Sequence, residues 1–142
     1  IEFVFYVEHW RENYSKYLDF DGIYSSCGIH PHWSHLTTSR TFDDLERCLQ
    51  HPKVIAIGEM GLDLDQSNRN TQQQKKKSII FPFCQKKYRH IDQQIRVFEE
   101  QLRLAIKWNK SIVVHSRNAH LQTFEILKKV KLKSSIDSRM NS

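Results

Sequence analysis

The sequence lacks any long hydrophobic run. No apolar stretch among its 142 residues approaches the ~20 residues that span a membrane. Hydrophobic residues make up 39% of the chain and charged residues 27%, a balance typical of a soluble globular protein. We therefore expect one domain with no membrane partner, and the sequence predicts no particular oligomeric state.

Cysteine is also scarce, with only Cys27, Cys48 and Cys84 in the chain. The number is odd, the three residues are far apart, and none belongs to a C-x-x-C pair. This pattern argues against a zinc ribbon or a disulfide framework and favours a reducing compartment. We accordingly expect an intracellular protein, either cytoplasmic or nuclear.

Several familiar catalytic motifs are missing. The sequence contains no glycine-rich phosphate loop, no G-x-S-x-G elbow and no H-E-x-x-H zinc motif. Residues 1–5 include no initiator methionine and no basic region, so they are not a signal peptide. They are typical of the middle of a longer protein, and we expect a partial sequence.

Positive charge is the main compositional excess. The net charge of +6 favours anionic partners, of which nucleic acid is the most obvious. Residues 66–90 hold seven Lys or Arg residues and no Asp or Glu. We expect this segment to be a basic, disordered insertion. The alternative is a basic loop that contacts phosphates.

Three short apolar runs each lead into a side chain suited to metal or acid–base chemistry. We interpret the runs as strands at residues 22–29, 54–58 and 111–114. The residues that follow them are His30, Glu59 and His115. A structural alternative for Glu59 is a cap or a salt bridge to a neighbour.

Apolar residues at helical spacing separate these runs. The predicted helices are roughly residues 5–18, 41–51, 91–109 and 121–130, with Thr41 and Asp44 as a capping box for the second. Alternating helices and strands predict an α/β fold with a parallel sheet. In α/β barrels the reactive residues gather at the carboxyl ends of the strands. We therefore expect His30, Glu59 and His115 at one end of one sheet.

The chemistry of these residues favours a divalent cation. Imidazole and carboxylate together form a mixed nitrogen and oxygen site, for which Glu59 and His115 are the candidates. Arg117 could receive a phosphate or a carboxylate through two hydrogen bonds. Two ligands are fewer than a catalytic metal needs, so further ligands must come from elsewhere. A thiol site at Cys27 and His30 is the poorer interpretation, because a core cysteine accounts for Cys27 more simply.

Four blocks of sequence resemble the TatD family of metal-dependent deoxyribonucleases. They are CGIHPH at residues 27–32, IGEMGLD at 57–63, VFEEQLRLA at 97–105 and VVHSRNA at 113–119. The blocks occur in the family's order and cover about residues 22–130, interrupted by the basic insertion. One such block is only moderately specific, but four in order are quite specific.

The resemblance implies a partial TIM-type (β/α) barrel that cleaves DNA with a two-metal site, using Mg, Mn or Zn. On this resemblance Glu59 and His115 are metal ligands and catalytic residues. His30, His32 and Arg117 match positions that bind or surround the substrate. Asp63 matches a position whose role is to orient the loop.

The chain also departs from the family pattern. It contains no Asp-x-His-x-His strand, and it ends before the later histidine and aspartate that the family uses. Ser111 replaces the usual proline, and Leu121 replaces the usual acidic residue. We therefore expect residues 1–130 to be a partial hydrolase domain and residues 131–142 to be a non-homologous tail. We also expect the chain by itself to cleave DNA poorly.

Two other functions remain open from the sequence. The same barrel could hydrolyse a small amide or ester, as amidohydrolase-type enzymes do, because a fold does not determine the substrate. The chain could also be a non-catalytic, basic remnant that binds nucleic acid through residues 66–90. Hydrolysis that depends on a divalent metal separates the two enzymatic alternatives from the third.

Overall fold

The computed structural model of the chain describes residues 2–4, 18–65 and 91–140. Within these ranges, four strands form one sheet in the order β1-β2-β3-β4, and every neighbouring pair is parallel. The strands are β1 (Glu2–Val4), β2 (Ser25–Cys27), β3 (Val54–Asp63) and β4 (Ser111–Arg117). Each strand therefore lies beside the next one along the chain, which is the arrangement of strands in an α/β barrel.

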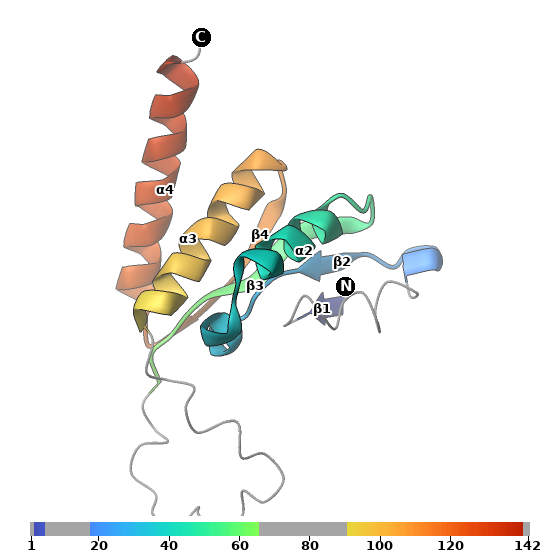
Figure 1. Cartoon of the computed structure of the whole chain (residues 1–142), viewed down its shortest axis with the longest axis horizontal. Coiled ribbons are helices and arrows are strands. Elements are labelled where there is room, and N and C mark those ends of the chain that lie inside the picture. The colour runs from blue at the N-terminus through green and yellow to red at the C-terminus, as the bar shows by residue number, and fades with distance from the viewer. Residues whose placement is uncertain (1, 5–17, 66–90, 141–142) are drawn as a thin grey trace, which may run out of the picture.

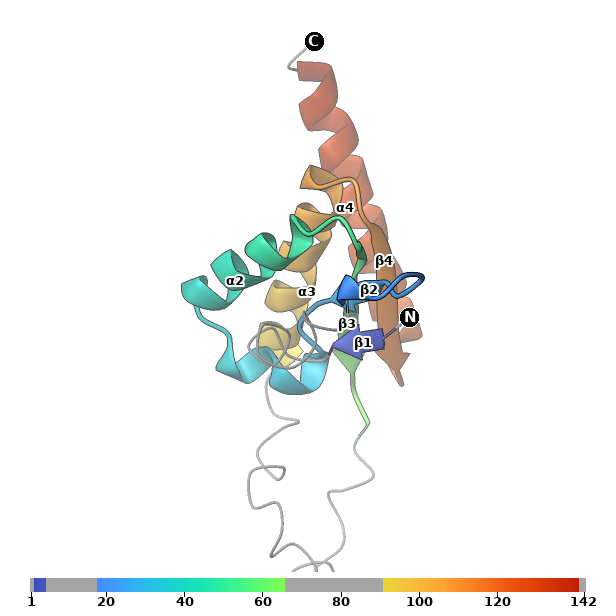
Figure 2. The same ribbon diagram turned by 90° about the vertical axis from the view of Figure 1, so that its right-hand side faces the viewer.

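The helices connect and cover these strands. They are the short 3-10 helix η3 (Pro31–Leu36), then α2 (Ser39–Leu49), α3 (Ile91–Lys107) and α4 (His120–Met140). Helices α2 and α3 lie on the same face of the sheet (Figures 1 and 2). Helix α4 lies beside α3, where Lys129 Nζ is 2.8 Å from Glu99 Oε1.

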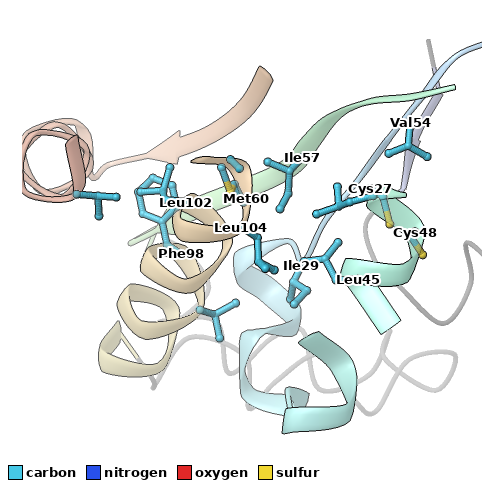
Figure 3. Close-up of a cluster of buried hydrophobic side chains, with 14 of the residues drawn as sticks. Cys27, Ile29, Leu45, Cys48, Val54, Ile57, Met60, Phe98, Leu102 and Leu104 are labelled. Atoms are coloured by element: carbon cyan, nitrogen blue, oxygen red, sulfur yellow. The ribbon is translucent and has the colours of Figure 1, made fainter. Parts of the chain in front are cut away.

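The hydrophobic core fills the space between the sheet and helices α2 and α3 (Figure 3). Ile57 and Met60 of β3 are fully buried, as are Leu45 of α2 and Phe98 of α3. Burying each such side chain stabilises the fold by about 1.5–3 kcal/mol. Because these contacts converge on β3, they hold the strand that carries Glu59 firmly against the helices.

The strand bounds differ from those that the apolar runs predicted. Strand β2 is shorter than residues 22–29, and both β3 and β4 are longer than predicted. Glu59 and His115 therefore lie inside strands, and the prediction that they end their strands is wrong. The reason is that main-chain pairing of β3 with β4 continues to Asp63 and Arg117, beyond the apolar runs from which the strands were predicted.

The first strand, β1, was not predicted. It is three residues long and pairs with β2. A strand of this length is too short to show a periodic pattern, so only the other three strands could be predicted from the sequence.

Helix α2 begins earlier than predicted. Its N-cap is Thr38, whose hydroxyl accepts the N–H of Thr41, while the Thr41 hydroxyl accepts the N–H of Thr38. The capping box that the sequence predicted for Thr41 and Asp44 is therefore wrong. Asp44 instead forms an ion pair with Arg47, at 3.0 Å.

Some predictions fall on residues outside the described ranges. These are the helix at 5–18, except for Leu18, and the basic insertion at 66–90. The domain boundary at residue 130 stays a prediction, and helix α4 continues through it to Met140. Within the described ranges, no helix combines the length and apolar character needed to cross a membrane.

Candidate metal centre

Glu59 lies at a bulge in the pairing of β3 with β4. The consecutive β4 residues Val113 and Val114 pair with Gly58 and Met60, so Glu59 has no partner in the register. A bulge of this kind redirects the side chain of the extra residue and is common beside active sites. The Glu59 side chain is 26% exposed, so its carboxylate remains accessible.

Two glycines allow the strands to approach closely here. Gly58 and Gly61 have φ angles of +140° and +142°, which L side chains rarely adopt. A Cβ atom on Gly61 would lie 2.0 Å from the carbonyl oxygen of His115. Glycine is therefore needed opposite His115, and it leaves space between the side chains of Glu59 and Asp63.

The imidazole of His115 lies between two carboxylates. Its Nδ1 is 3.0 Å from Glu59 Oε1, and its Nε2 is 3.2 Å from Asp63 Oδ2. The register explains the arrangement, because Gly61 pairs with His115 and Asp63 pairs with Arg117. Glu59 and Asp63 thus flank the position of Gly61, and both reach the same ring.

Only one of the two carboxylates can accept a hydrogen bond from a neutral His115 ring. A neutral imidazole carries one N–H, so it can donate to only one of them. The side chain of Asp63 is fully buried, and a buried carboxylate requires hydrogen bonds. With Nε2–H donating to Asp63, the lone pair of Nδ1 faces Glu59. The lone pair of Nδ1 is then available to a proton or a metal ion that it shares with the Glu59 carboxylate.

His30 reaches the same place from the loop after β2. It has an extended backbone, as expected before Pro31, and it caps η3 by accepting the N–H of His32 at Nδ1. Its Nε2 is 3.3 Å from His115 Nδ1. The residue is 8% exposed, so the loop holds its ring in a well-enclosed position.

Asp63 connects the remaining predicted site residues. Its carboxylate is 2.7 Å from His32 Nε2 and 3.8 Å from Arg117 Nε, and it also accepts the N–H of Asp65 at 3.0 Å. The Arg117 guanidinium contacts the Asp65 carboxylate as well. The family resemblance implied only a loop-orienting role for Asp63. The Glu-x-Gly-x-Asp spacing, which puts residues 59 and 63 on one face of a strand, was the available signal.

The donor set fits a divalent cation. One donor atom from each of His30, Glu59 and His115 lies within 4.8 Å of the other two. Two imidazoles and one carboxylate form a ligand set found in zinc hydrolases, where a fourth position stays open. The contact of His115 Nε2 with Asp63 Oδ2 matches the carboxylate–histidine contact that orients metal-binding histidines.

The structure therefore brings all five predicted site residues together. Glu59, His115 and His30 form the group with the metal-capable atoms, while His32 and Arg117 meet at Asp63. The prediction that Glu59 and His115 lie at one shared site is confirmed by their contact. The individual roles of these residues as ligands or substrate contacts stay predictions.

Cys27 is not part of this group. It is fully buried in the hydrophobic core beside Cys48, as the core interpretation predicted. Burial raises the pKa of the Cys27 thiol well above its usual value, and interaction with Cys48 adds to the shift. Because the thiolate is the reactive form, this environment is unfavourable for a thiol site.

Comparison with known families gives a match that covers nearly the whole chain. The model of the family TatD related DNase matches residues 3–138. Among curated proteins, the chain is 31% identical over 116 residues to the 3'-5' RNA nuclease TATDN2 of Homo sapiens. It is 33% identical over 105 residues to the 3'-5' ssDNA/RNA exonuclease TatD of Erwinia amylovora.

These alignments cover most of this chain but a smaller part of each relative. They include 82% of the chain and 13% of the human protein, and 74% of the chain and 33% of the bacterial one. The crystal structure of YJJV, a TatD homolog from Escherichia coli K12, superimposes with a TM-score of 0.70 at 22% identity. That superposition covers 92% of this chain and 44% of the homolog, and it shows that the fold is part of a TatD-type barrel.

Proposed function

Because the chain belongs to the family of TatD related DNases, we propose that it contributes the metal-binding residues of a nuclease that hydrolyses phosphodiester bonds in DNA. The observation that carries the proposal is the position of His115 between two carboxylates. Asp63 faces one ring nitrogen, and the other nitrogen is left beside Glu59 Oε1 at 3.0 Å. Metal-binding histidines are oriented in this way.

Glu59, His115 and His30 are the residues that would hold the cation. A bound Mg²⁺, Mn²⁺ or Zn²⁺ would polarise a phosphoryl oxygen and activate water for attack on phosphorus. Within the described residues, this cluster offers three donor atoms, which is the usual number for one catalytic cation. The second cation, which the family resemblance implies, needs further ligands. For this reason we expect the chain by itself to cleave slowly.

His32 and Arg117 are the residues that would meet the substrate beside the cation. Both contact Asp63, and Arg117 is 44% exposed, so an incoming phosphate can compete for its guanidinium. Arginine suits this task because its donors match the oxygens of a phosphate. The relatives' names support a single-stranded DNA or RNA substrate that is degraded from its 3' end.

The test combines metal binding with cleavage. The full chain and its Glu59→Gln variant are titrated with Mn²⁺ and followed by electron paramagnetic resonance. The same proteins are then incubated with end-labelled single-stranded DNA and RNA, with an EDTA control. We expect Mn²⁺ binding and slow, EDTA-sensitive shortening from the 3' end, both strongly reduced by Glu59→Gln.

Each alternative gives its own result in this test. A chain that binds no Mn²⁺, or binds it equally well after Glu59→Gln, contradicts the proposed metal site. Hydrolysis of a small ester such as p-nitrophenyl acetate without DNA cleavage would indicate an amidohydrolase-type activity. Binding of the oligonucleotides without any cleavage would indicate the non-catalytic function.

A further inference from the structure

Helix α3 carries two glutamines where a helix usually presents apolar side chains to the core. Gln101 is fully buried, and Gln94 is 2% exposed. They are seven residues apart, which is two helical turns, so they lie on one face of α3. A buried amide is unfavourable unless its donors and acceptor are satisfied, and both side chains find partners on the sheet side.

Gln101 pairs with the main chain of Ile29. Its Oε1 accepts the N–H of Ile29 at 2.7 Å, and its Nε2 donates to the carbonyl oxygen of Ile29 at 3.1 Å. A second donation from Nε2, to the Val97 carbonyl at 3.3 Å, holds the amide against its own helix. Ile29 directly precedes His30, so this two-bond contact fixes the peptide that leads into that imidazole.

Gln94 pairs with Asp63 in the same way. Its Oε1 accepts the N–H of Asp63 at 2.9 Å, and its Nε2 donates to the Asp63 carbonyl oxygen at 3.3 Å. The contact holds the last residue of β3, whose carboxylate faces both His32 and His115. One helix face therefore holds the backbone at two separate strand ends that carry site residues.

We infer that Gln101 and Gln94 are positioning residues of the metal centre. Gln101 acts through Ile29 to place His30, and Gln94 acts through Asp63 to place His115. Each amide bonds to both the N–H and the C=O of one residue, as a neighbouring strand does. The inference rests on the proposed function, and it assigns to α3 a role in holding the ligands ready for the cation.

The test uses the full 142-residue chain and three variants with the same substitution. Gln101→Met and Gln94→Met remove the amide but keep the length of the side chain. Gln93→Met is the matched control, because Gln93 lies on the same helix and donates to Thr37 Oγ1 at 3.1 Å instead of to a site strand. Chemical denaturation reports the stability of each variant, so that a general loss of folding is recognised.

Two measurements then report on the site. The first is nitrogen NMR of the histidine rings in metal-free protein, and the second is Mn²⁺ affinity from electron paramagnetic resonance. We expect Gln101→Met to shift the ring signals of His30 and His115 and to weaken Mn²⁺ binding about 10- to 100-fold, the usual effect of losing an orienting partner. Gln94→Met should shift the signals of His32 and His115, and Gln93→Met should change neither measurement.

A folded Gln101→Met protein with unchanged ring signals and unchanged Mn²⁺ affinity would overturn the inference. If Gln101→Met does not fold, hydrogen exchange of the backbone amides in the unaltered chain tests the inference instead. The N–H groups of Ile29 and Asp63 should then be protected, and rapid exchange of both would count against the role of the glutamines. An unaltered chain that binds no Mn²⁺ contradicts the proposed function instead, while the ring signals still test the positioning role.

Discussion

Asp63 Oδ2 lies 3.2 Å from His115 Nε2, and this contact decides which ring nitrogen of His115 remains for Glu59. Asp63 is buried, so its carboxylate depends on the donors that surround it. One of these donors is His32 Nε2 at 2.7 Å. Asp63 thus sets the orientation of the His115 ring, although Asp63 is not one of the three residues that form the metal-capable group.

The substitution Asp63→Asn tests this relationship. Asparagine has the same shape but lacks the charge, and its amide group can present an N–H to the His115 ring instead of accepting one. We expect Mn²⁺ affinity to fall about 10- to 100-fold while the fold is retained. Asp65→Asn is the control, because Asp65 contacts Arg117 rather than His115. Equal affinities of the two variants for Mn²⁺ would contradict the assigned role of Asp63.

A second prediction concerns the close approach of β3 to β4. Gly61→Ala places a Cβ atom 2.0 Å from the His115 carbonyl oxygen, so β4 must move away. Gly22 also has a positive φ, of +76°, but a Cβ atom there meets nothing within 4 Å. We expect Gly22→Ala to lower the free energy of unfolding by about 1–2 kcal/mol, from backbone strain alone. Gly61→Ala should lower it by roughly 3 kcal/mol or more.

Urea denaturation of both glycine variants measures these losses. Gly61→Ala should also weaken Mn²⁺ binding, because the shift of β4 separates His115 from Glu59. Gly22→Ala should bind Mn²⁺ as the unaltered chain does. Comparable losses of stability in the two variants would contradict the close approach of β3 to β4 at Gly61.

A third prediction concerns the reactivity of the buried thiols. Cys27 is fully buried, Cys48 is 4% exposed, and burial raises the pKa of Cys27. Few molecules therefore carry a thiolate at neutral pH, and reagents cannot reach it. In a Cys84→Ser background we expect almost no reaction with a disulfide reagent until urea unfolds the chain, after which both thiols should react. Prompt reaction under native conditions would contradict the packing around Cys27.

A fourth prediction concerns the pH dependence of stability. Glu46 of α2 accepts hydrogen bonds from Lys107 Nζ and, at 3.0 Å, from Trp108 Nε1 near the end of α3. The bond from Lys107 is the main cause that lowers the pKa of Glu46. A lowered pKa in the folded state means that the stabilisation is present above the ordinary carboxyl pKa of about 4.3 and is lost as the pH falls through the lowered value.

The measurement is the difference in unfolding free energy between the unaltered chain and Glu46→Gln. This difference should be constant near neutral pH and should shrink as the pH drops below about 4. Lys107→Met in the same series should remove most of the pH dependence, because it removes the main cause of the shift. A difference that does not change between neutral and acidic pH would contradict the contact between α2 and α3.

The order of the elements from β2 to α4, apart from the short η3, could be predicted from the sequence. Apolar runs of four to eight residues, separated by helical spacing, indicate parallel strands with helical connections. Parallel strands with such connections bring their carboxyl ends to one edge, so His30, Glu59 and His115 were expected to meet. The contact between Glu59 and His115 at 3.0 Å agrees with that expectation.

The roles of Asp63, Gln94 and Gln101 could not be predicted in this way. Asp63 and His115 are 52 residues apart, and Gln101 and Ile29 are 72 apart. Such contacts depend on which residue of β3 lies opposite which residue of β4, and the bulge at Glu59 shifts that register by one residue. A pattern of apolar and polar residues specifies which face of a strand is buried and so excludes a shift of one residue. A shift of two residues keeps the same face buried, so the exact register also depends on backbone pairing and close packing. The sequence by itself therefore determined that His30, Glu59 and His115 meet, and only the tertiary structure decided which further residues join them and how their atoms face one another.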